Sequence, residues 1–198
     1  MTDLDKILEY LRGDSNGKLD LRWGSFNKID LHNVSLSGVD LSYADLRNAS
    51  LQNINLSDAK LSKAELNGAN LYEANLSNAI LSNANLSGAN LYEVNLSKAN
   101  LREANLNETR LYEANLSNAD LRKANLSHAY LILANLSNAD LSGANLAYAN
   151  LVNANLTNTD LSGADLSGVN LDDVNLSEAI FREPYIIDIN KILPSDTE

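Results

Sequence analysis

A leucine or phenylalanine recurs at every fifth position from Leu21 to Phe181, and this period limits the possible folds more than any other feature of the chain. The run holds 33 such positions without an insertion, and 31 of them are Leu. The residue two places before each is small or apolar, and it is Ala in 22 of the 33 cases. The residue directly before each is Asn or Asp in 24 cases. We call each five-residue unit a pentad and its Leu or Phe the central residue.

The spacing within a pentad predicts a coiled chain. Two apolar residues that are two places apart lie on one face of an extended segment. The next apolar residue follows after three places, so the chain must bend once per pentad to keep both sets inside. Repetition of this bend closes a coil whose core is filled by Leu and Ala. Asn side chains stacked between successive coils are expected to bond one another or nearby backbone.

Tracks that repeat every 20 residues indicate that four pentads form one coil. Tyr72, Tyr92 and Tyr112 recur at this interval, and each is followed by Glu. A series of hydroxyl residues also recurs at this interval, each after a Leu: Ser37, Ser57, Ser77, Ser97, Ser117, Ser137, Thr157 and Ser177. About eight coils at a strand spacing of roughly 4.8 Å would form a rod about 40 Å long.

The recurring A-(N/D)-L-x-x pattern, present as ANLSN, ANLYE and ADLSG, resembles the pentapeptide-repeat family over residues 19–183. The resemblance implies an all-β solenoid, namely a right-handed quadrilateral β-helix with four pentads per coil. The handedness comes from the resemblance alone.

Both ends of such a stack expose apolar side chains and need covers. Residues 1–18 predict an N-terminal capping helix and turn, in which Gly13 suits the helix end. The apolar residues of this segment share one helical stripe, formed by Leu4, Ile7, Leu8 and Leu11. Trp23, in the first full pentad, is expected to pack against this helix.

Residues 184–198 are expected to form a C-terminal cap and a polar tail. The Ile-rich segment 185–193 fits either a cap or a contact that joins two copies of the chain, as a C-terminal element does in some relatives. Its composition leaves helix and strand both open. We therefore expect a monomer, or a dimer formed through 185–193.

Composition excludes several kinds of chemistry. The chain has no Cys, so it has no disulfide and no thiolate metal site. A formal charge of −11 argues against direct nucleic-acid binding, which needs a basic stripe. The acidity fits solubility alone or a basic protein partner. Neither a secretory signal nor an apolar run of the ~20 residues of a membrane helix is present, so we expect a soluble, cytoplasmic protein without membrane association.

No catalytic, cofactor or metal site is predicted, and the chain is not expected to be an enzyme. A rod with outward side chains offers little concavity for converging groups. The glycines of GADLSGVN lack the Lys and the following helix of a phosphate loop. Asp160 and Asp165 lack the spacing of a calcium loop, and His32 and His128 are far apart in the sequence.

One predicted side departs from the repeat and is the candidate partner-binding surface. In the segment AYLILAN, Tyr130 replaces Asn or Asp, and Ile132 and Leu133 take positions predicted to face water. Stacking of coils places Tyr112 below this segment and Val152 above it. The candidate residues are Tyr72, Glu73, Tyr92, Glu93, Tyr112, Glu113, His128, Tyr130, Ile132, Leu133, Tyr148 and Val152.

Two interpretations of this side stay open. Its apolar and aromatic residues mark a partner surface, or its aromatic columns only strengthen the stack. The row of Glu residues meets a basic partner or is a solvated face, and Arg102, Arg110 and Arg122 are expected to offset its repulsion.

The main functional expectation is a non-catalytic scaffold that binds an unknown protein partner. The alternative is an acidic mimic of duplex DNA that binds a type II topoisomerase, DNA gyrase, as the fluoroquinolone-resistance branch of the family does. Two features argue against the alternative: no loop interrupts the coils, and basic residues dilute the negative field.

Overall fold

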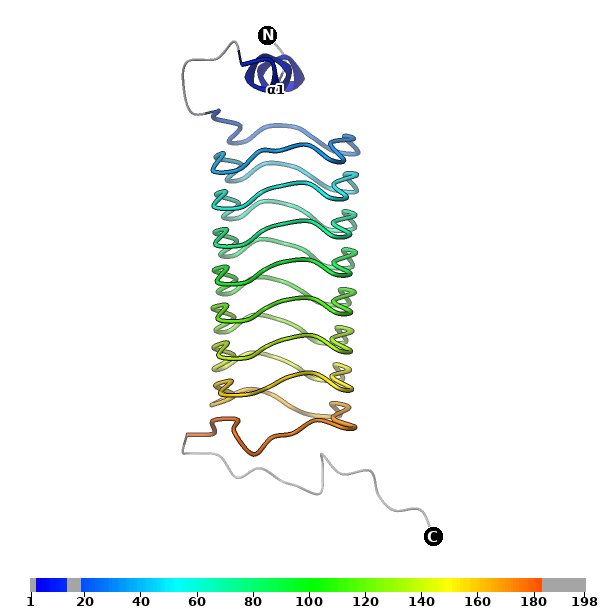
Figure 1. Cartoon of the computed structure of the whole chain (residues 1–198), viewed down its shortest axis with the longest axis vertical. Helices are drawn as coiled ribbons and strands as arrows, with labels where there is room; N and C mark the ends of the chain where they lie inside the picture. The colour runs from blue at the N-terminus through cyan, green and yellow to red at the C-terminus, as the bar shows by residue number, and fades with distance from the viewer. Residues whose placement is uncertain (1–2, 14–18, 183–198) are drawn as a thin grey trace.

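The computed structural model describes residues 3–13 and 19–182. Helix α1 (Asp3–Leu11) lies at the N-terminal end of a column of stacked coils (Figure 1). Within the described residues the coils carry isolated parallel β-bridges in place of longer strands. These bridges run from Asp20↔Asp40 to Asp160↔Ile180 and always join residues 20 apart. One coil therefore takes four pentads, as the tracks in the sequence predict.

The bend of each pentad is a β-turn that begins at the central residue. In one such unit the Ala44 N–H donates to the Leu41 carbonyl at 3.0 Å, and Tyr43 has a φ of 64°. A positive φ at the third residue is typical of a type II turn. The equivalent position has a positive φ in nearly every pentad and holds mostly Asn, Gly, Glu and Lys. This third turn residue forms a corner of the rod and points its side chain outward.

The core consists of the central Leu residues and of the Ala residues two places before them. Leu91 and Ala89 are fully buried, as are most of their equivalents. Two buried threonines take the Ala position, and both hydroxyls are satisfied. Thr109 donates to the Leu106 carbonyl at 2.7 Å, and Thr159 donates to the Leu136 carbonyl at 2.8 Å. Each buried Leu contributes about 1.5–3 kcal/mol to folding.

Amide ladders hold successive coils together beside the backbone bridges. The Asn95 side chain donates to Asn75 Oδ1 at 3.3 Å, and its own Oδ1 accepts the Ser97 N–H at 3.1 Å. The same two bonds recur at other Asn positions of the coils. The preference for Asn or Asp before the central residue therefore has the structural cause that the sequence suggests.

Helix α1 contacts the core through one residue of the predicted stripe. Ile7 is 1% exposed and belongs to the core cluster, and Tyr10 packs partly against it. Leu8 and Leu11, of the same predicted stripe, are 40% and 45% exposed, so the coils cover this stripe only in part. Gly13 has a φ of 79° and ends the helix as predicted.

Trp23 does not pack against α1 as expected. It is 71% exposed, and its ring stacks on Tyr43 of the next coil with centroids 4.0 Å apart. Trp23 and Tyr43 both take the corner position, where their outward side chains lie one coil apart. The expected C-terminal cap and the dimer contact at 185–193 lie outside the described residues.

Candidate interaction surface

Four tyrosines form a continuous column along one side of the rod. We call this side, whose central residues run from Leu31 to Leu171 in steps of 20, the tyrosine side. Ring centroids are 5.6 Å apart for Tyr72 and Tyr92, and 6.0 Å apart for Tyr92 and Tyr112. Tyr112 stacks on Tyr130 at 5.9 Å with an interplanar angle of 9°. The predicted contact between Tyr112 and the AYLILAN segment is therefore confirmed.

Two of the glutamates beside this column bind tyrosine hydroxyls. The Tyr92 hydroxyl donates to Glu113 Oε1 at 3.1 Å, and this bond raises the pKa of Tyr92. A hydrogen bond with Glu73, together with desolvation, raises the pKa of Tyr72 to about 12. These hydroxyls stay protonated near neutral pH.

The role of the arginines that are expected to offset this acidic row stays a prediction. Among the described residues, neither Arg102, Arg110 nor Arg122 forms an ion pair with Glu73, Glu93 or Glu113. Glu113 and Glu73 are bound by the hydroxyls of Tyr92 and Tyr72.

The apolar part of the tyrosine side begins at Tyr130, the last ring of the column, and continues toward the C-terminal end of the rod. Tyr130 is 44% exposed and Leu133 is 54% exposed, whereas Ile132 is half-buried. Val152, also half-buried, lies in the next coil, where its carbonyl accepts the Leu133 N–H at 3.0 Å. Leu133 takes the corner position with a φ of 59°, and it is the one aliphatic residue with a positive φ in the described chain.

A second aromatic pair occupies the corner beside the tyrosine side. His128 stacks on Tyr148 with centroids 5.2 Å apart and an interplanar angle of 10°. Tyr148 is 63% exposed. Its ring lies over Gly168, where a Cβ would come within 2.7 Å of the ring carbons. The structure thus places the twelve predicted residues on one side and its adjoining corner, and six of them form two separate aromatic stacks.

Two shallow hollows follow the tyrosine side, and they share Arg110 and Tyr112. The larger, of about 670 Å³, is lined by Gly88, Glu108, Arg110, Tyr112, His128 and Tyr130. The smaller, of about 460 Å³, is lined by Tyr72, Asn90, Tyr92, Glu93, Arg110 and Tyr112. Sequence reasoning did not assign Gly88, Asn90, Glu108 or Arg110 to the site. The available signal was Arg110 itself, which takes a position that usually holds Asn or Asp.

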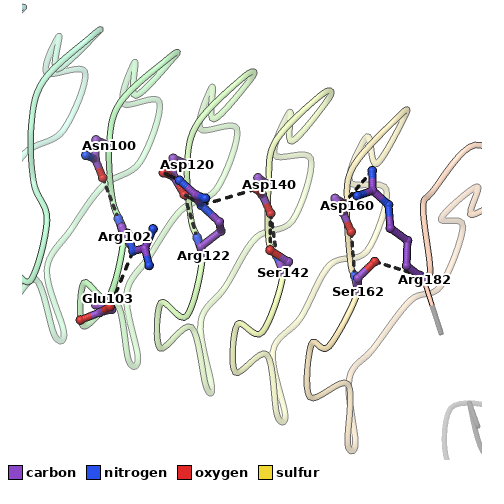
Figure 2. Close-up of polar contacts among 10 residues, drawn as sticks. All are labelled: Asn100, Arg102, Glu103, Asp120, Arg122, Asp140, Ser142, Asp160, Ser162 and Arg182. Carbon is purple, nitrogen blue, oxygen red and sulfur yellow. Dashed lines mark hydrogen bonds and ion pairs between the residues drawn. The ribbon is translucent and has the colours of Figure 1, made fainter. Parts of the chain in front are cut away.

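A different side carries acidic residues that the chain neutralises itself (Figure 2). Arg122 lies 2.6 Å from Asp120 and 3.6 Å from Asp140, and the hydrogen bond from Arg122 lowers the pKa of Asp120. Burial raises the pKa of Asp160, but hydrogen bonds from Ser162 and the charge of Arg182 outweigh it, so this pKa lies below its ordinary value. These carboxylates are bound within the chain.

The described residues offer no metal centre, since no group of three or more His, Cys, Asp or Glu residues is arranged to hold an ion. Within the same part of the chain, no helix has the length and apolar character needed to cross a membrane.

Comparisons with solved structures find several similar proteins. A trypsin-treated variant of QnrB1, a plasmid-mediated fluoroquinolone resistance protein, is 20% identical with a TM-score of 0.67, over 83% of this chain and 87% of that one. HetL, a pentapeptide repeat protein involved in heterocyst differentiation regulation in the cyanobacterium Nostoc sp., is 35% identical over 89% of this chain and 97% of its own, with a TM-score of 0.35. Rfr23 of the cyanobacterium Cyanothece is 26% identical over 89% and 95%, with a TM-score of 0.24.

No curated protein matches the chain. The sequence profile of pentapeptide repeats matches it in eight copies between residues 19 and 183. The matched ranges include 19–53, 40–78, 49–88, 69–107, 89–127, 109–147 and 149–183. They span most of the chain, and the bridged coils have the geometry of this fold. The chain therefore belongs to the pentapeptide repeat family, whose members are right-handed quadrilateral β-helices.

Proposed function

We propose that this protein is a non-catalytic interaction scaffold, a rod that presents its tyrosine side to a protein partner. The observation that carries the proposal is Leu133. A bulky residue with a positive φ is strained, and at 54% exposure its side chain gains little from burial. A residue that contributes so little to the fold is best explained by contact with another molecule.

The surroundings of Leu133 support an interface. The large apolar residues of the coils that are exposed number six, and three of them, Tyr130, Leu133 and Tyr148, lie in two successive coils. Trp23 and Tyr43 stack on each other in the first coils, and Ile80 lies apart from both groups. Interfaces are enriched in Tyr and Arg. The two hollows are depressions in an otherwise regular surface, into which side chains of a partner can fit.

Affinity capture from native cells tests the proposal. The bait variant Tyr130→Asp with Ile132→Asp removes the exposed ring and charges the apolar surface, so we expect the captured partner to be lost. The matched control is Ser97→Asp with Ser117→Asp, which places the same charges on another side and should retain the partner. Thermal unfolding of both variants checks that the rod remains folded. Equal capture by the two double variants would place the interface elsewhere.

The alternative, an acidic mimic of duplex DNA that binds DNA gyrase, is favoured by the net charge of −11. The internally paired Asp120, Asp140 and Asp160 weaken it, because a mimic must present its carboxylates to a basic surface. A gyrase supercoiling assay decides: inhibition by the pure protein would support the mimic, and unchanged supercoiling would dismiss it.

The cytoplasmic location and the oligomeric state remain predictions. Cell fractionation tests the first. Light scattering of the full chain and of a chain shortened at residue 182 tests whether 185–193 joins two copies.

A further inference from the structure

Arg110 differs from the other arginines of the coils. Each of the others lies between 2.6 and 3.6 Å from a carboxylate oxygen: Arg22, Arg47, Arg102, Arg122 and Arg182. Arg110 is exposed and forms no ion pair with any described residue, although Glu108 lines the same hollow. In a chain with a net charge of −11, an arginine left without a carboxylate is unusual. Its planar guanidinium can bind one carboxylate through two hydrogen bonds.

Arg110 also interrupts an amide ladder. On the tyrosine side the Asn90 side chain donates to Asn70 Oδ1 at 3.0 Å. The next two positions of this ladder are Arg110 and Tyr130, which bridge to one another through the backbone but carry no amide. The ladder of amide bonds is therefore missing in the two coils beside the shared part of the hollows. Arg110 stands where an Asn side chain would stabilise the rod.

The ring stacking limits what the hollows can receive. Tyr112 is stacked with rings of the coils on both sides, and His128 is stacked on Tyr148. The tyrosine column therefore offers ring edges and leaves no gap for a flat aromatic ligand between its rings. Glu93 and Glu108 line the hollows as well, and they disfavour a doubly charged phosphate group. A single carboxylate fits this balance best.

The charges along the tyrosine side have an order. Glu73 and Glu93 come first. Arg110 lies in the middle, in the same pentad as Glu113, whose carboxylate accepts the Tyr92 hydroxyl at 3.1 Å, and Leu133 and Val152 follow. At roughly 4.8 Å per coil, the two steps from Glu93 to Leu133 cover about 10 Å, the reach of about three extended residues. Charge complementarity along this line specifies a short mixed-charge segment and excludes a uniformly acidic or basic one.

We propose that Arg110 reads an acidic side chain of the protein partner, on a short segment whose flanking residues are a basic residue facing Glu93 and an aliphatic residue facing Leu133. This inference rests on the proposed function and names the partner's chemistry. Glu73 and Glu93 repel an acidic residue that is shifted one or two coils toward them, so Arg110 sets specificity and register.

Selection from a randomised peptide library displayed on phage tests this assignment. The three baits are the wild-type rod, Arg110→Glu, and the control Arg102→Glu, which makes the same charge change on another side. We expect the wild type and Arg102→Glu to enrich the same basic–acidic–aliphatic pattern. Arg110→Glu should enrich Lys or Arg at the position of the acid. A synthetic peptide with the sequence enriched by the wild-type rod should bind the Arg110→Glu rod about tenfold more weakly than it binds the wild-type rod. The same peptide with Lys in place of its acidic residue should bind the Arg110→Glu rod more tightly than the wild-type rod.

The outcomes separate the two proposals. An Arg110→Glu rod that enriches the wild-type pattern, or a wild-type rod that enriches none, overturns the assignment of Arg110. In either case, the scaffold proposal stands if the Tyr130→Asp and Ile132→Asp variant no longer captures the partner from native cells. If that variant captures the partner as the wild type does, both proposals fail. Should Arg110→Glu fail to fold, Arg110→Gln replaces it, and the preference for an acid should then disappear without a new preference for a base.

Discussion

The tyrosine side and the side that carries the Ser37–Ser177 series, which we call the serine side, share one core and one backbone geometry but differ in their outward bonds. On the serine side an Asn Oδ1 accepts the N–H two residues ahead in coil after coil, from Asn55 to Asn175. On the tyrosine side this series stops at Arg110 and Tyr130 and resumes at Asn150. The serine side is therefore made for stability, and the tyrosine side departs from the stabilising pattern where its hollows lie.

Substitutions in the amide ladders of the two sides should change the free energy of unfolding most. Asn95→Ala on the serine side removes the bond to Asn75 and the bond from Ser97, and we expect a loss of about 1–3 kcal/mol. Arg110→Asn on the tyrosine side restores an amide next to Asn90, and we expect a gain of about 0.5–1.5 kcal/mol. Denaturant unfolding measures both free energies. A loss of stability in Arg110→Asn would show that Arg110 stabilises the rod. This result would contradict the proposed difference between the serine side and the tyrosine side.

Exchanging the corner residues gives a smaller effect. Leu133 and Asn118 both have a φ near 59°, on the tyrosine and serine sides respectively. Because Asn tolerates this conformation better than Leu, Leu133→Asn should stabilise the rod by about 1 kcal/mol, and Asn118→Leu should destabilise it by a similar amount. Thermal unfolding compares the two. The contrast predicts that Leu133→Asn also weakens partner capture, whereas Asn118→Leu leaves capture unchanged. A less stable Leu133→Asn variant would mean that Leu133 packs usefully within the rod.

The sequence predicts the coil well because its inward residues obey one spacing rule without exception. Leu91, Ala89 and their equivalents in the other coils are buried for the same reason. The 20-residue spacing of Tyr72, Tyr92 and Tyr112 places their rings in a stack. The contact of Tyr112 with Tyr130 follows from the same stacking.

Arg110 could not be assigned in this way. Its nearest acidic residues in sequence suggested simple charge compensation, but whether an arginine has a carboxylate within reach depends on side-chain directions around a corner. The same applies to Trp23, whose corner geometry turns it toward Tyr43 and away from the end of the rod. The repeat pattern does not predict the role of a residue when that role depends on the direction of an outward side chain.

The smallest expected effect concerns alkaline pH and the hydroxyls of the tyrosine column. The folded rod raises the pKa of Tyr72 from 10.0 to about 12, chiefly through its hydrogen bond with Glu73. A pKa raised by folding contributes stability that is complete below the unfolded value, and this contribution is lost as pH rises through the folded value. The wild-type rod should therefore lose more stability than Tyr72→Phe between pH 10 and pH 12, and the two should run parallel below pH 10. Thermal unfolding across this range measures the difference. Tyr148→Phe is the control, because among the described residues the Tyr148 hydroxyl has no hydrogen bond to a carboxylate. If all three proteins fall in parallel above pH 10, the hydroxyl of Tyr72 is not held by Glu73, and the column depends on ring stacking alone.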